Sequence, residues 1–162
     1  MKKIIAIIIL FFFVSANKSF ALEVSCKFEE VHSNGTVNQG ILLYKKNKLR
    51  YEYNSSNLFI IFIEKNNANI FDKKTEKIKP LNHNLDLLNS LMDLADQYPY
   101  IPSQINNEKM NILIEKNLTS KFIKRISINS KRAKLSLYLN DCILEKPINN
   151  LFFSHNPVFS YK

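Results

Sequence analysis

The 162-residue chain is poor in the residue types that build most cofactor sites. Its only glycines are Gly35 and Gly40, so a Gly-rich loop that cradles a phosphate cannot be formed. The three histidines are His32, His83 and His155. Each lies in or beside a predicted turn, without ligand-like spacing to cysteines or carboxylates. We therefore expect no cofactor and no metal site.

Groups arranged for catalysis are also lacking. Glu29 and Glu30 are adjacent on a predicted strand, so their side chains point to opposite faces of a sheet and cannot work as a carboxylate pair. Asp93 and Asp96 share one face of a predicted helix, where solvent exposure explains them. No serine has the sequence surroundings of a nucleophile elbow. The sequence predicts that the protein is not an enzyme.

Arginine is scarce although the chain is basic. The formal net charge is +9, but Arg50, Arg125 and Arg132 are the only arginines, and the lysines are scattered over every segment. Surfaces that bind nucleic acids favour clustered basic residues with a bias toward arginine. We therefore expect no nucleic-acid partner.

The N-terminal segment is typical of a cleavable signal peptide. Lys2 and Lys3 precede an eleven-residue apolar run, Ile4–Val14, and Ser19-Phe20-Ala21 supplies small residues at a cleavage site. A helix that crosses a bilayer needs roughly 17 to 25 apolar residues, so a membrane anchor is the less favoured interpretation. We predict a leader over 1–21, with cleavage after Ala16 as the alternative, and one exported domain over 22–162.

The chain contains two cysteines, Cys26 and Cys142, which are far apart in sequence. They do not form a Cys-x-x-Cys pair, which argues against a redox catalyst. An exported protein can form a disulfide, and closing so long a loop would stabilise the fold by about 4 to 5 kcal/mol in the chain-entropy model. Two separate buried thiols are the alternative, and the sequence leaves both open.

Alternating apolar and polar residues predict a mainly β fold. Leu49, Tyr51 and Tyr53 alternate with charged residues, and Asn34-Gly35 suggests a two-residue hairpin turn. Residues 58–63 are all apolar, so this strand should be covered on both faces. The stretch 105–117 suits a strand or a buried helical turn, and we favour the strand. The other predicted strands are 24–31, 37–44, 49–53, 68–71, 76–81, 122–128, 133–139, 142–146 and 151–153.

One segment changes to a helical period. Leu88, Leu91, Met92 and Ala95 recur at helical spacing within 84–95, and Asn84 is a candidate N-cap. We predict a mainly β fold with few helices, a single curved antiparallel sheet against which this helix packs. Its apolar face has two interpretations. It is either an ordinary core or a pocket for an acyl chain, and the period alone does not decide between them.

Four motifs occur in order along the chain: Gly40–Tyr53, Ile60-Ile61, Ile70-Phe71-Asp72, and Lys79-Pro80-Leu81 before a Leu-rich helix. Together they resemble the periplasmic outer-membrane lipoprotein carrier (LolA-like) family. The closing segment 147–157, with its paired phenylalanines and prolines, is also similar to the end of family members. One departure is clear, because there is almost no room between the leader and Cys26 for the family's usual first helix. The chain therefore resembles a divergent member with a shortened N-terminus.

The resemblance implies that the curved antiparallel sheet forms an open half-barrel whose concave apolar face is covered by one or two helices. It also implies a function, a periplasmic carrier in a Gram-negative bacterium that binds the acyl chains of outer-membrane lipoproteins. The expected partners are acylated lipoproteins, an inner-membrane ABC lipoprotein exporter, and an outer-membrane lipoprotein receptor or the membrane itself. We expect a monomer. The alternative is a noncatalytic secreted β-domain that serves as a structural or protein-interaction module.

The resemblance also nominates binding residues. Lys45 and Lys46 stand at the family's basic pair, where an arginine is important for cargo transfer, and Arg50 stands at its Arg-aromatic position. Lysine keeps the charge but lacks the planar donor fork of arginine. The expected lipid- or lipoprotein-binding residues are Lys46, Leu49, Arg50, Tyr51, Phe59, Ile61, Ile63, Leu88 and Leu91.

Overall fold

The structure is a computed structural model that describes residues 22–55, 57–65, 67–81, 85–106, 110–130 and 134–154, without the side chain of Asp86. The predicted leader, and with it the cleavage site, lies outside the described residues. His83, Asn84 and His155 lie outside them as well. In the part that is described, no helix is long and apolar enough to cross a membrane.

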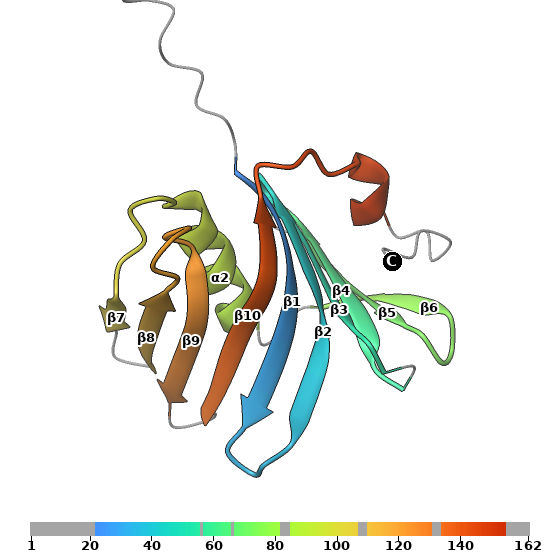
Figure 1. Cartoon of the computed structure of the whole chain (residues 1–162). Coiled ribbons are helices and arrows are strands. Elements are labelled where there is room, and N and C mark those ends of the chain that lie inside the picture. The colour runs from blue at the N-terminus through green and yellow to red at the C-terminus, as the bar shows by residue number, and fades with distance from the viewer. Residues whose placement is uncertain are drawn as a thin grey trace, which may run out of the picture.

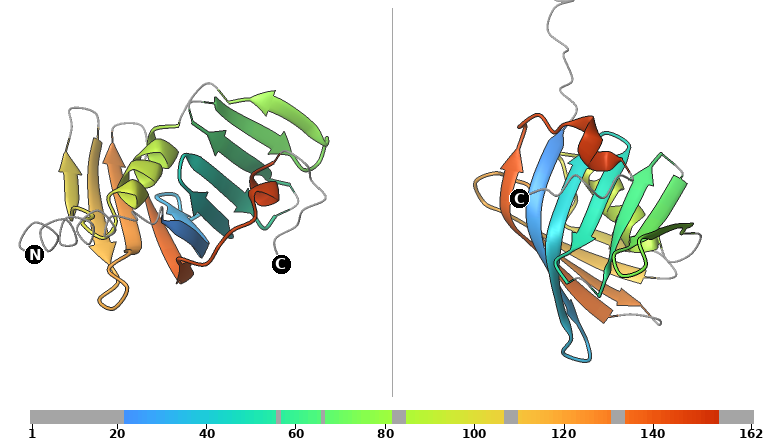
Figure 2. Two further views of the ribbon diagram at one scale, coloured as in Figure 1. Left: turned by 90° about the horizontal axis from the view of Figure 1, so that it is seen from above. Right: turned by 90° about the vertical axis from the view of Figure 1, so that its right-hand side faces the viewer.

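Ten antiparallel strands form a single sheet that does not close on itself, in the order β6-β5-β4-β3-β2-β1-β10-β9-β8-β7 (Figure 1). The strands are β1 (Glu23–His32), β2 (Val37–Lys45), β3 (Lys48–Tyr53), β4 (Phe59–Glu64), β5 (Asn67–Asp72), β6 (Lys77–Pro80), β7 (Gln104–Asn106), β8 (Met110–Lys116), β9 (Ile123–Ser130) and β10 (Lys134–Leu144). The sheet curves around α2 (Asp86–Asp96), its covering helix (Figure 2). The predicted half-barrel is confirmed.

The two halves of the chain meet at the middle of the sheet. Strands β1 to β6 form a meander, the chain then crosses through α2, and β7 to β10 return as a second meander. β1 pairs with β10 over most of its length, for example at Phe28 opposite Leu139. The disulfide Cys26–Cys142 joins these same two strands. The disulfide alternative is therefore the one that the structure shows.

The helix lies on the concave side of the sheet (Figure 2). Leu88, Leu91, Met92 and Ala95 are buried, as the helical period predicts. The helix begins at Asp86, and its N-cap position is occupied by Leu85 without a side-chain cap bond. The candidate N-cap Asn84 lies outside the described residues.

Three local predictions are corrected by the backbone. The residues between β1 and β2 form a four-residue loop in which Gly35 has a φ of 84°, not a two-residue hairpin turn. Asn140 and Asp141 do not end a strand, since β10 continues through them with an irregularity opposite Cys26. Residues 151–153 belong to the 3-10 helix η1 (Asn150–Phe153). Asn149 caps η1 by accepting a hydrogen bond from Leu151 N, which alternation patterns do not detect.

Strand β4 has apolar side chains on both faces of the sheet. Its odd-numbered residues belong to the cluster under α2, whereas Ile60 and Phe62 form a separate buried cluster with Phe71 on the opposite face. The expectation that residues 58–63 are covered on both sides is confirmed, and the alternation fixes which face belongs to the concave side.

Candidate acyl-binding site

The concave face brings together most of the residues that the sequence nominated. Leu49 and Tyr51 on β3 and Ile61 and Ile63 on β4 lie in one apolar cluster with Leu88 and Leu91 of α2. Phe59 is partly buried and packs against the same cluster. The strand residues share this face because side chains two positions apart point to the same side of a sheet.

The concave cluster is filled by side chains in this structure. Leu49, Tyr51, Ile63 and Leu91 are all buried, and the cluster continues to β8, β9 and β10. Ile112, Ile126 and Leu137 mark that continuation. The helix therefore occupies the concave face, and an acyl chain could enter only as α2 moves away from the sheet.

An aromatic group forms the middle of this face. The rings of Phe28 and Tyr51 stack with centroids 4.0 Å apart, and Tyr53 meets both edge-on at 5.4 and 5.3 Å. Gly40 lies opposite Phe28 in the sheet. A Cβ at Gly40 would lie 2.5 Å from the Phe28 ring and 2.0 Å from the Glu52 carbonyl oxygen. The absence of a side chain at Gly40 is thus required for the stack.

Polar groups are buried at one edge of the apolar face. The Tyr53 hydroxyl donates to Glu30 Oε2 at 2.8 Å, and His32 Nε2 lies 3.7 Å from Glu30 Oε1. Burial and the neighbouring Glu30 carboxylate raise the pKa of Tyr53 above its ordinary range. Sequence reasoning missed this group, although the alternation that places Phe28 on the concave face also places Glu30 there.

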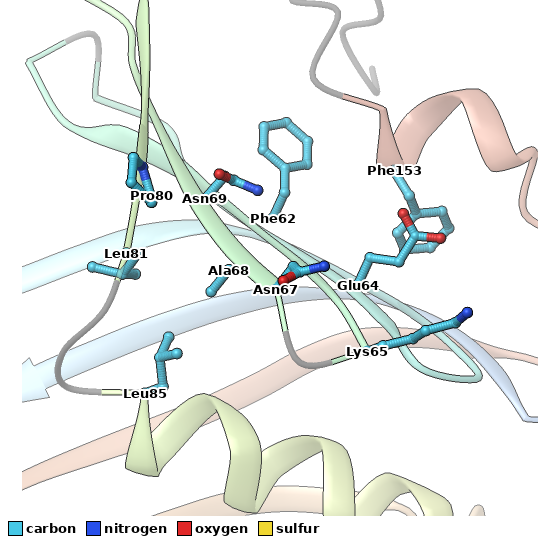
Figure 3. A pocket seen from close by; sticks show the side chains of 10 residues that line it. All are labelled: Phe62, Glu64, Lys65, Asn67, Ala68, Asn69, Pro80, Leu81, Leu85 and Phe153. Atoms are coloured by element: carbon cyan, nitrogen blue, oxygen red, sulfur yellow. The ribbon is translucent and has the colours of Figure 1, made fainter.

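A surface hollow of about 640 Å³ opens at the end of the β4–β5 hairpin (Figure 3). On the concave side it is lined by Ala68, Leu81 and Leu85, all of which pack in or against the concave cluster. On the other side it is lined by Phe62 and Phe153. The hollow therefore borders the concave cluster beside the start of α2.

Arg50 does not face the other nominated residues. Its side chain is 1% exposed and lies on the convex face, where the guanidinium binds Glu52 at 2.9 and 2.5 Å. Arg50 Nη1 also donates to the Phe152 carbonyl oxygen at 2.9 Å, and the guanidinium lies 5.3 Å from the Phe62 ring centroid. Arg50 thus holds η1 against the convex face of the sheet and cannot contact a ligand on the concave face.

The two lysines of the basic pair have different surroundings. Lys46 is exposed in the β2–β3 turn, away from the concave cluster. Lys45 Nζ donates to the Ile148 carbonyl oxygen at 3.0 Å and pairs with Glu23 at 3.1 Å. Lys45 therefore holds the segment before η1 against the sheet, and neither lysine contributes to the concave face.

Among the described residues, no group of three or more His, Cys, Asp and Glu side chains could hold a metal ion. No protein-family model matches the chain, and a search of curated proteins finds no match.

The chemistry that the described concave face offers is apolar contact, with a buried carboxylate and tyrosine hydroxyls at one edge.

Proposed function

We propose that the protein is a periplasmic carrier that binds acyl chains of outer-membrane lipoproteins and moves them from the inner to the outer membrane. The observation that carries the proposal is the covering of one continuous apolar concave face by a single amphipathic helix. The hollow beside the start of α2 is the route by which a chain would reach this face. The leader motif and the disulfide support an exported protein.

The free energy of burying an acyl chain is comparable with that of the contacts between α2 and the sheet. Burying a Leu or Met side chain contributes roughly 1.5 to 3 kcal/mol, so the contacts of Leu88, Leu91, Met92 and Leu94 contribute about 6 to 12 kcal/mol. Each buried methylene contributes about 0.8 kcal/mol, so a chain of about fifteen methylenes offers about 12 kcal/mol. An acyl chain can therefore offset the loss of the helix contacts.

A second candidate is a noncatalytic secreted β-domain that serves as a structural or protein-interaction module. The observation that favours it is the complete burial of Leu49, Tyr51 and Ile63 beneath α2. A sheet whose helix never leaves would have no acyl site. The two functions therefore differ in whether the contact between α2 and the sheet opens.

The test is mass spectrometry of the protein purified from its host periplasm without detergent. A carrier co-purifies with acylated lipoprotein or lipid, and the purified protein releases lipoproteins from spheroplasts. Leu91→Asn is the test variant, because it places an amide on the side of α2 that faces the sheet. Asn89→Ser is its matched control, because it changes an exposed position on the same helix. A ligand-free protein that releases no lipoprotein from spheroplasts would exclude the carrier and leave the interaction module.

A further inference from the structure

Two large apolar side chains are almost fully exposed. Tyr100 is 88% exposed and Leu118 is 87% exposed, whereas Val37, the next most exposed large hydrophobic residue of the described chain, is 50% exposed. Single exposed hydrophobic residues are common on protein surfaces. Two such residues on neighbouring loops at one end of a molecule call for a physical explanation.

Hydrogen bonds join the two loops that carry them. The Tyr98 hydroxyl donates to the Ser120 carbonyl oxygen at 3.2 Å, and Lys116 Nζ donates to the Ile101 carbonyl oxygen at 2.8 Å. Tyr98 and Ile101 bracket Tyr100, and Lys116 and Ser120 bracket Leu118. The segment after α2 and the β8–β9 turn therefore lie side by side (Figure 1).

Both loops hold their apolar residue in a fixed position. Asn117 Oδ1 accepts from Thr119 N at 2.9 Å and from Ser120 N at 3.0 Å, which forms a tight turn with Leu118 at its tip. Pro99 and Pro102 flank the other loop tip and restrict its backbone. Because the backbones of both loops are already restrained, little conformational entropy is lost when Tyr100 and Leu118 bind to another surface.

The two loops that carry Tyr100 and Leu118 are themselves basic. Residues 97–103 and 117–121 contain no acidic residue, and Lys121 is exposed in the β8–β9 turn. The β2–β3 and β4–β5 turns lie at the same end of the antiparallel sheet and expose Lys46 and Lys65. The acidic residues at this end are Glu115, Glu64 and Glu23, which pair with Arg125, Lys48 and Lys45, together with the exposed Glu145, Asp93 and Asp96.

We propose that Tyr100 and Leu118 form a membrane-docking tip, which inserts into the interface of a bilayer containing anionic phospholipids. An aromatic and an aliphatic side chain enter the boundary between headgroups and acyl chains, and the lysines at this end face the anionic headgroups. The inference deepens the proposed function, because it names the surface through which a carrier of acyl chains would meet a membrane.

The absence of tryptophan gives this tip a clean reporter. Tyr100→Trp and Leu118→Trp are prepared by secretion through the native leader, beside Val37→Trp near the opposite end of the sheet. Vesicles of phosphatidylcholine with phosphatidylglycerol should shift the emission of the two tip variants to the blue and leave the control unchanged. Pure phosphatidylcholine or high salt should weaken the response, because the lysines then lose their counter-charge.

Co-sedimentation with the same vesicles measures the affinity directly. Tyr100→Ser with Leu118→Ser should lower it at least about tenfold, whereas Val37→Ser should leave it unchanged. All of these side chains are exposed, so the unfolding midpoint should stay constant and report that the variants are folded. Absence of vesicle binding, or binding that survives the double substitution, would overturn the docking tip. Acyl-chain binding to the concave face is measured separately, so either proposal can fail without the other.

Discussion

The hydroxyl of Tyr44, on β2, donates a hydrogen bond to the Asp96 carboxylate in the last turn of α2. Tyr44 is buried within the concave cluster, while Asp96 lies at the exposed end of the helix. Burial, followed by this hydrogen bond, raises the pKa of Tyr44 above its ordinary range. The pair therefore fixes the end of the covering helix to the sheet by a polar contact that adds to the apolar packing.

Replacing this tyrosine should loosen the helix. Tyr44→Phe keeps the ring but removes the donor, so we expect a loss of about 1.5 kcal/mol in the free energy of unfolding. If α2 moves to admit an acyl chain, uptake of a fluorescent fatty acid should become faster in Tyr44→Phe. Chemical denaturation and stopped-flow fluorescence measure the two effects. Unchanged uptake in a destabilised variant would show that the Tyr44–Asp96 contact does not limit helix movement.

The glycine under the aromatic stack should tolerate no substitution. Gly40→Ala would place a Cβ against the Phe28 ring and the Glu52 carbonyl oxygen, so we expect a cost of about 3 kcal/mol or more from forced repacking. Gly35→Ala is the control, since no atom lies within 4 Å and only its positive φ adds strain, about 1 kcal/mol. Thermal unfolding of the two variants compares them. Equal losses would contradict the close packing of Phe28 over Gly40.

Arg50 should matter for stability and not for ligand binding. Arg50→Ala removes the donor to the Phe152 carbonyl and leaves the half-buried Glu52 with Lys73 as its remaining partner, so we expect a loss of about 3 kcal/mol in unfolding free energy. Arg125→Ala is the matched control, because its pair with Glu115 is partly exposed and should contribute less than about 1 kcal/mol. Isothermal titration with a fatty acid should show equal affinity for Arg50→Lys and the unaltered protein.

Alkaline pH should destabilise the fold through its buried tyrosines. Burial raises the folded-state pKa of Tyr44, Tyr51 and Tyr53 above the ordinary value of 10.0. Their stabilising contribution is then complete below about pH 10 and decreases above it, because the unfolded chain loses these protons first. Tyrosinate absorbance during a pH titration should show these three tyrosines ionising only as the protein unfolds. Free titration of all seven tyrosines in the folded state would contradict their burial.

The sheet was predictable because its chemistry is local. Alternation over Leu49, Tyr51 and Tyr53 and the uniform run 58–63 each follow from the two-residue period of a strand, and both are found as predicted. The helix followed in the same way from the period of Leu88, Leu91 and Ala95. Burial could be inferred for these residues because their neighbours on one face lie only two to four positions away.

The parts that failed depend on distant partners. Arg50 was nominated as a binding residue from sequence resemblance, although its alternation with Leu49 and Tyr51 already places it on the other face of β3. Its bond to the Phe152 carbonyl, more than 100 residues away in the chain, could not be predicted from local sequence. Residues 151–153 have the composition of a strand, and the cap at Asn149 together with packing of Phe153 on Leu43 favours η1 instead. The burial of Glu30 could not be predicted without knowing that β1 lies at the centre of the sheet, between β2 and β10.

The central claim, that the concave face binds acyl chains, is tested most directly by photo-crosslinking with a diazirine-labelled fatty acid. Peptide mass spectrometry would locate the adducts along β4, where successive residues point to opposite faces. The carrier predicts adducts on Ile61 and Ile63, under α2, and none on Ile60, which lies on the convex face and does not line the hollow. Labelling confined to Ile60 and Phe62, or none above that of a denatured control, would contradict it.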